Sequence, residues 1–142
     1  MSFCVIEEGV EVGVGTEIKN FVELRSGTVI GENCYIDSGV KSSGNNWIGN
    51  GVTLRYDTIV ARGCDIGDRS YICPQVMFNN VDHTGLQVGG AKIGVDCFIG
   101  TNATIGAGIT ICDNVVIGAK SLVLKDILIP GVYVGIPARR IR

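Results

Sequence analysis

Apolar residues recur at every sixth position along almost the whole chain. Counting from Ile6, twelve of the thirteen residues at this spacing are apolar, and Ser42 is the polar exception. The thirteen positions are Ile6, Val12, Ile18, Leu24, Ile30, Ile36, Ser42, Ile48, Leu54, Val60, Ile66, Ile72 and Phe78. A second series begins at Ile93 and runs through Ile129 before it fails at Gly135. A helix would need apolar residues at i, i+3, i+4 and i+7, so this spacing favours short strands joined by tight corners.

The residue four places after each apolar position is usually small or β-branched, as at Val10, Thr28 and Cys34. Glycine follows the apolar residue at Gly13, Gly31, Gly49 and Gly67. These glycines are 18 positions apart, which predicts that three six-residue units make one turn of a triangular coil. A single coil cannot bury its own apolar edge, so stability must come from coils stacked about 4.8 Å apart. Each inward Ile or Leu should contribute roughly 1.5–3 kcal/mol by burial.

The two apolar series are out of step with each other. Phe78 and Ile93 are fifteen positions apart, which is not a multiple of six, so we expect one extruded loop over about 79–92. Loops held on a rigid scaffold commonly carry function, and this loop contains His83, the single histidine of the chain. Around Ser42 we expect either a local irregularity of the coil or a contact with a substrate.

Composition and charge narrow the class of protein. The chain is 46% hydrophobic but only 6% aromatic, which fits a core of small aliphatic side chains in one domain, residues 1–142. A net charge of −2 argues against a general nucleic-acid or anionic-membrane binder. We expect a cytoplasmic protein, because no secretory signal and no membrane-spanning apolar segment is evident.

The six cysteines show no CxxC pair and no histidine partners at metal-ligand spacing. We interpret most of them as small core residues, with a disulfide or a nucleophilic cysteine as the alternatives. No metal site is predicted.

The repeated unit, seen at 30–34 and 99–104, resembles the hexapeptide-repeat acyltransferases. The resemblance covers nearly the full chain and implies an all-β, single-stranded left-handed parallel β-helix, which is an exception to the right-handed crossover rule. It also implies a homotrimer with active sites between neighbouring subunits. From Ile66 onward the chain is similar to the galactoside, maltose and polysaccharide acetyltransferase branch. The segments that carry this likeness are 72–76, 82–85, 93–119, 124–127 and 135–139.

This resemblance implies transfer of an acetyl group from acetyl-CoA to a hydroxyl or amino group of a sugar, such as a nucleotide sugar or polysaccharide precursor. Imidazole titrates in the range needed to take a proton from the acceptor, so His83 is the predicted general base. Asp82 or a backbone carbonyl would orient the ring. Backbone N–H groups of the neighbouring coil would stabilise the oxyanion.

The resemblance also suggests binding residues for both substrates. Positions that line the CoA groove of the family match Thr101, Gly118, Ala119 and Lys120. The family's basic positions near the nucleotide end match Lys125, Arg139 and Arg142, where cations meet phosphate. Candidates for the acceptor pocket, chosen for polarity near the loop, are Asn79, Asn80, Asp82, Arg55, Tyr56 and Asp57. Residues 55–57 do not reproduce the acceptor pattern of the branch, so the resemblance does not assign the acceptor.

Two other functions stay open from the sequence. One is acylation of a non-sugar small molecule, including an antibiotic-like alcohol. The other is a noncatalytic β-solenoid that serves as a binding or assembly subunit. The γ-type carbonic anhydrases share the helix but need three histidines for their metal, and this chain has one.

Overall fold

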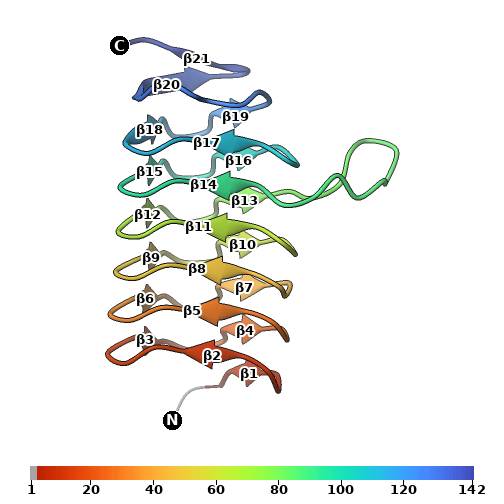
Figure 1. Ribbon diagram of the computed structural model, residues 1–142, viewed down its shortest axis with the longest axis vertical. Coiled ribbons are helices and arrows are strands. Elements are labelled where there is room, and N and C mark those ends of the chain that lie inside the picture. The colour runs from red at the N-terminus through yellow and green to blue at the C-terminus, as the bar shows by residue number, and fades with distance from the viewer. Residues whose placement is uncertain (1–2) are drawn as a thin grey trace.

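The computed structural model describes residues 3–142, which form a triangular solenoid of stacked coils (Figure 1). The chain visits three parallel sheets in rotation, which we call faces 1, 2 and 3. The fold class predicted from the sequence, an all-β left-handed parallel β-helix, is confirmed. None of residues 3–142 belongs to an apolar helix of membrane-spanning length.

The strands are short and each face collects one per coil. Face 1 consists of β1 (Val5–Ile6), β4 (Glu23–Leu24), β7 (Lys41–Ser42), β10 (Ile59–Val60), β13 (Met77–Phe78), β16 (Thr104–Ile105) and β19 (Leu122–Val123). Face 2 consists of β2 (Glu11–Val12), β5 (Val29–Ile30), β8 (Trp47–Ile48), β11 (Asp65–Ile66), β14 (Lys92–Ile93) and β17 (Thr110–Ile111). Face 3 consists of β3 (Glu17–Ile18), β6 (Tyr35–Ile36), β9 (Thr53–Leu54), β12 (Tyr71–Ile72), β15 (Phe98–Ile99), β18 (Val115–Ile117), β20 (Gly131–Gly135) and β21 (Ala138–Arg140).

Three rows of corners join the faces, and each row is named by the faces that it connects. Corner 1–2 comprises 7–10, 25–28, 43–46, 61–64, 79–91 and 106–109. Corner 2–3 comprises 13–16, 31–34, 49–52, 67–70, 94–97 and 112–114. Corner 3–1 comprises 19–22, 37–40, 55–58, 73–76, 100–103 and 118–121.

The strand register confirms the predicted turn of 18 residues. On face 2, Val29 pairs in parallel with Glu11 below it and Trp47 above it. Backbone N–H groups reach the coil above, as in the 2.8 Å bond from Gly31 N to the Ile48 carbonyl. The coils therefore satisfy one another's backbone polar groups, as stacking requires.

The core consists of the predicted inward columns. The residues at the six-residue spacing are buried from Leu24 to Phe78 and from Ile93 to Val123, together with most of the small residues four places after them. The first coil differs, because no coil lies below it among the described residues. Ile6 and Val12 are therefore 49% and 40% exposed. Their partial burial stabilises the fold less than the full burial of the equivalent residues in the coils above.

The irregularity expected around Ser42 is not found. Ser42 is a regular inward residue of β7, paired with Leu24 below and Val60 above, and it is only 2% exposed. Its hydroxyl lies 2.9 Å from the hydroxyl of Thr28, which is also buried. The core accepts these two polar side chains because each one satisfies the other.

The extruded loop exists, but it is shorter than the predicted range of 79–92. Asp65 pairs with Lys92 across 27 positions, nine more than separate Trp47 from Asp65. Asn79 still donates to the Ile105 carbonyl at 3.0 Å, Ala91 is fully buried, and Lys92 lies in β14. The inserted residues thus leave the coil at corner 1–2, where Figure 1 shows the loop standing out from the body. The ladder continues above it with its register intact.

The second series of buried apolar residues ends at Val123, six residues before the predicted end at Ile129. Ile129 is 59% exposed, whereas Ile127 is buried and forms a parallel bridge with Ile111. In this last coil the Asp126 carboxylate accepts the Thr110 N–H at 2.9 Å, as the Asp65 carboxylate accepts the Trp47 N–H at 3.0 Å lower on the same face. The chain then returns to face 3, where β20 pairs in parallel with β18, and β21 folds back antiparallel on β20.

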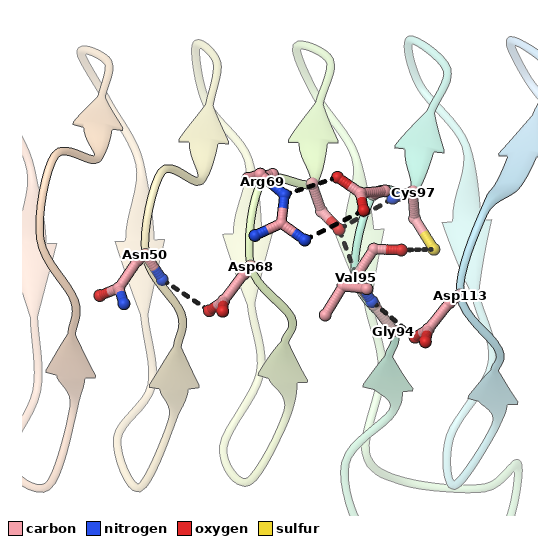
Figure 2. Close-up of polar contacts among 9 residues, drawn as sticks. Asn50, Asp68, Arg69, Gly94, Val95, Cys97 and Asp113 are labelled. Atoms are coloured by element: carbon pink, nitrogen blue, oxygen red, sulfur yellow. Dashed lines mark hydrogen bonds and ion pairs between the residues drawn. The ribbon is translucent and has the colours of Figure 1, made fainter.

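Corner 2–3 is reinforced by side chains that bond the coil below (Figure 2). The Asn50 side-chain oxygen accepts the Glu32 N–H at 2.9 Å, and the Asp68 carboxylate accepts the Asn50 N–H at 2.8 Å. Above the loop, Asp113 accepts the Val95 N–H at 2.8 Å. These contacts satisfy corner N–H groups that the strand ladders do not reach.

All six cysteines are free thiols. Cys34, Cys64, Cys73 and Cys97 are buried, which confirms the interpretation of most of them as core residues. Burial is the main cause that raises the pKa of the Cys64 thiol to about 11, so this thiol is neutral near pH 7. A neutral buried thiol is a poor nucleophile.

Candidate functional site

The extruded loop is a small hairpin with defined hydrogen bonds. The Asn80 carbonyl accepts the Val88 N–H at 2.9 Å, and Val81 and Gln87 form an antiparallel bridge. The hairpin is tied to the coil below by the Asn80 side chain, which donates to the Arg62 carbonyl at 3.1 Å. It is tied to the coil above by a 3.0 Å bond from Gly108 N to the Gly89 carbonyl. The loop root is thus fixed to both neighbouring coils.

His83 lies exposed in the turn at the end of this hairpin. Among residues 3–142, no side chain makes a hydrogen bond to its ring. The turn itself is closed by a 3.0 Å bond from Gly85 N to the Asp82 carbonyl, and Gly85 has φ of +83°. That conformation favours glycine, which explains why Gly85 follows the His83-Thr84 pair. The imidazole is therefore presented outward on a structured support.

Asp82 shapes the turn. One carboxylate oxygen accepts the Thr84 N–H at 2.8 Å, the Thr84 hydroxyl at 2.6 Å and the Leu86 N–H at 3.1 Å. These bonds, chiefly the one from the Thr84 hydroxyl, lower the Asp82 pKa and keep the carboxylate charged. The carboxylate thus faces the loop's own donors, and the expected contact with the His83 ring is not made within the described chain.

The four residues predicted to line the CoA groove come together on corner 3–1. Thr101 and Lys120 are on successive coils, joined by a 2.8 Å bond from Lys120 N to the Thr101 carbonyl. Gly118 and Ala119 complete the corner, where the backbone is partly exposed. A Cβ on Gly118 would lie 2.6 Å from the Val134 side chain, so packing requires glycine here. Val134 thus occupies the space beside Gly118, and Ala119 and Lys120 are the exposed residues of the corner.

Two of the three predicted basic residues share a cavity at the C-terminal end. Lys125 and Arg139 line a cavity of about 590 Å³ together with Tyr133 and Arg140. Arg142 is not in the lining, and its backbone carbonyl accepts the Val132 N–H at 2.7 Å. Arg140 escaped the sequence reasoning, although its position beside Arg139 in a basic tail was a usable signal. The cavity combines cations with an aromatic ring.

The acceptor candidates divide between two corners. Asn79 and Asn80 are at the root of the loop on corner 1–2. Residues 55–57 are on corner 3–1, so the expectation that they lie near the loop of their own chain is wrong. Sequence distance misled here, because consecutive six-residue units lie on different faces of the triangle. Asp57 is a turn residue with φ of +60°.

Residues 55–57 instead share corner 3–1 with the predicted CoA residues. Arg55 makes a 2.9 Å ion pair with Asp37, a buried carboxylate, and donates to the Tyr71 hydroxyl at 2.7 Å. Asp37 and Tyr71 were missed by the sequence reasoning. The spacing could have revealed Asp37, because it precedes Arg55 by 18 residues, one full turn, and so lies directly below it.

Comparisons with known proteins agree with this architecture. Residues 90–125 match the family model described as bacterial transferase hexapeptide (six repeats). Over 86 residues the chain is 40% identical to galactoside O-acetyltransferase of Escherichia coli, a match that covers 54% of this chain and 42% of that protein. Over 73 residues it is 40% identical to chloramphenicol acetyltransferase of Agrobacterium fabrum, covering 51% of this chain and 35% of that protein. The chain thus spans less than half the length of these curated relatives.

Solved structures share the fold across nearly all of the chain. AntD, an N-acyltransferase from Bacillus cereus solved with dTDP-4-amino-4,6-dideoxyglucose and coenzyme A, superposes with a TM-score of 0.80 at 23% identity, covering 95% of this chain and 84% of AntD. PerB from Caulobacter crescentus, solved with CoA and GDP-perosamine, gives 0.72 at 21% identity and covers 97% and 54% of the two chains. At these identities the likeness establishes the fold. The resemblance to the hexapeptide-repeat transferases predicted from the sequence is therefore confirmed, through the family model at 90–125 and the curated relatives over about half of the chain.

Proposed function

We propose that this protein is an acetyl-CoA-dependent acetyltransferase that modifies a hydroxyl or amino group of a sugar, with His83 as the general base. The observation that carries the proposal is the placement of the chain's single histidine in the turn of the loop inserted between regular coils. The two curated relatives described above are acetyltransferases, and AntD and PerB were solved with CoA and amino-sugar nucleotides.

His83 has the chemistry for the proton transfers. As the acceptor oxygen or nitrogen attacks the thioester carbonyl, the neutral imidazole takes its proton. A carbon–oxygen or carbon–nitrogen bond forms, the carbon–sulfur bond breaks, and the imidazolium returns the proton to the CoA thiolate. Backbone N–H groups of an adjacent coil would stabilise the oxyanion.

Corner 3–1 and the C-terminal cavity fit acetyl-CoA. The exposed corner residues Ala119 and Lys120 offer a surface for a pantetheine arm, and Thr101 adds a hydroxyl one coil below. Lys125 and Arg139 offer cations to the nucleotide phosphates, and Arg140 joins them in the same cavity.

The arrangement of corners supports a homotrimer with active sites between subunits. His83 belongs to the loop at corner 1–2, whereas the proposed acetyl-CoA site runs along corner 3–1. One chain does not gather both parts, but a second copy placed beside corner 3–1 brings its loop to that site. We place the protein in the cytoplasm, where six free thiols and acetyl-CoA are both maintained.

Turnover of acetyl-CoA with a panel of acceptors tests the proposal. The panel contains amino sugars, nucleotide sugars and simple glycosides, with chloramphenicol included because two curated relatives are named for it. His83→Ala should retain CoA binding and lose about 10²–10⁴-fold in turnover. Gln87→Ala, an exposed change in the same hairpin, should leave turnover unchanged.

The outcomes separate the competing functions. Acetylation of chloramphenicol alone would replace the sugar by an antibiotic-like alcohol. A chain that binds no CoA and tolerates His83→Ala would be a noncatalytic solenoid, and the enzyme proposal would be wrong.

A further inference from the structure

Corner 3–1 contains a polar cluster below the proposed acetyl-CoA site. Arg55 Nε donates to Asp37 Oδ2 at 2.9 Å, and a terminal guanidinium nitrogen donates to the Tyr71 hydroxyl at 2.7 Å. The Tyr56 ring lies 5.4 Å from the guanidinium carbon, and the Tyr71 ring stacks on Phe98 with centroids 5.6 Å apart. The guanidinium is thus held on three sides. A group so constrained loses little entropy when it binds a ligand.

The solenoid itself does not require this ion pair. The side chain of Asp37 is 3% exposed, and burying a carboxylate has a desolvation cost that an ion pair offsets only partly. Equivalent positions of the same corner one, two and three coils above Arg55 hold Cys73, Gly100 and Gly118, which stack without any charge. The Asp37 carboxylate also accepts the Ser38 N–H of its own corner at 2.9 Å, but that bond does not need Arg55, so the ion pair indicates a further role for the guanidinium.

Part of the guanidinium stays available. The Arg55 side chain is 33% exposed, and Asp37 and Tyr71 occupy two of its five N–H groups. Within residues 3–142 no further acceptor is bonded to it. The remaining donors lie in one plane, which matches the two oxygens of a carboxylate or phosphate.

The position of Arg55 relates it to the proposed reaction. Cys73 follows one coil above, where the Thr101 side chain faces its thiol, and Gly100 follows on the next coil. At about 4.8 Å per coil, Arg55 is about 10 Å below the coil of Gly100, which is buried, and Thr101, which is exposed. An acceptor entering the lower end of the acetyl-CoA site would therefore pass beside the guanidinium.

We infer that Arg55, fixed by Asp37 and Tyr71, binds an anionic group of the acceptor, so that the substrate is a sugar bearing a phosphate or a carboxylate. This inference rests on the proposed function. Arg55 recognises the substrate and takes no part in the proton transfers. Asp37 and Tyr71 are positioning residues that hold the guanidinium plane.

Paired acceptors that differ in charge test the inference. Glucosamine 6-phosphate is compared with glucosamine, and galacturonate with galactose, by kcat/KM in wild type, Arg55→Gln and Arg55→Lys. Arg69→Gln is the matched control, because Arg69 also pairs with an aspartate, Asp96 at 2.9 Å, but on corner 2–3. Equilibrium binding of all four sugars to the CoA-loaded protein is measured alongside, so that the test does not depend on turnover.

We expect wild type to prefer the charged sugar over its neutral partner in one of the two pairs. Which pair shows the preference tells whether phosphate or carboxylate is recognised. Arg55→Gln should lower the charged-to-neutral ratio by roughly 10- to 100-fold, mainly through KM, while Arg69→Gln leaves it unchanged. Arg55→Lys should recover part of the ratio, which a loss of folding would not permit.

Equal treatment of charged and neutral sugars by wild type, in turnover and in binding, would overturn the inference. So would an equal loss for both classes in Arg55→Gln. Failure of the proposed function looks different, because then wild type binds no CoA and acetylates no acceptor.

Discussion

Thr28 and Ser42 offer a direct test of how this solenoid accommodates polar groups in its core. Their hydroxyls are 2.9 Å apart, and the two residues are 0% and 2% exposed. Within the described chain each hydroxyl has the other as its hydrogen-bond partner. Removal of one leaves the other buried without a partner, whereas removal of both leaves no polar group to satisfy.

The expected energies follow from this pairing. Ser42→Ala and Thr28→Val should each lower the free energy of unfolding by about 1–3 kcal/mol, because each strands one buried hydroxyl. The double variant keeps similar side-chain volumes and should be close to wild type. The two changes should therefore couple by about 2–6 kcal/mol, which is the sum of the two single losses.

Urea unfolding of the four proteins, followed by circular dichroism at one protein concentration, measures these differences. Thr58→Val combined with Ser42→Ala is the control, because the Thr58 hydroxyl donates to the Cys73 carbonyl and shares no partner with Ser42. The loss in the free energy of unfolding of that double variant should equal the sum of the two single losses. Additive losses for Thr28 and Ser42 would refute the reasoning, since they would show that each hydroxyl is satisfied independently.

Two further predictions concern titrating groups. Asp82→Ala should accelerate amide hydrogen exchange at Thr84 and Leu86, which bond its carboxylate, whereas Asp82→Asn keeps an acceptor oxygen and should retain part of the protection; unchanged exchange in Asp82→Ala would contradict the described turn. Because the Asp82 pKa lies below its ordinary value of 3.8, its contribution to loop protection is present above pH 3.8 and is lost as the pH falls through the lowered pKa. The Cys64 pKa is raised from 9.0 to about 11, so its contribution to stability is full below pH 9 and is lost as the pH rises toward 11. The stability advantage of wild type over Cys64→Ala should shrink by about 2–3 kcal/mol across that range in urea unfolding, and a constant advantage would argue against burial of the neutral thiol.

The coil was predictable because its physics is local and repeated. Each inward residue, such as Ile36 or Ile72, occupies the same position in a six-residue unit, so spacing alone identifies the core. Ser42 broke the pattern without breaking the coil. The partner that satisfies it, Thr28, is fourteen residues earlier and on a neighbouring corner, and spacing gives no information about such pairs.

The candidate site was predictable only where it coincided with a break in the pattern or a motif. His83 stood out because the fifteen-residue gap forced its segment from the coil. Arg55 was named for its polarity near the loop, but the triangle places it on another corner. Asp37 and Arg140 went unnoticed because their roles come from neighbours that folding brings together, respectively Arg55 and the cavity around Lys125.

The hairpin that carries His83 has a consequence for how such a protein can change. Nine residues enter at one corner, yet Met77 still pairs with Thr104 and Asp65 with Lys92 in unbroken parallel register. The hairpin is anchored to the neighbouring coils at Arg62 and Gly108, and at its base Gly90 packs directly on the backbone of Gly63. The length and sequence of the hairpin can vary while the strand ladders persist. Natural variation can therefore alter the chemistry of the loop without disrupting the stacked coils that support it.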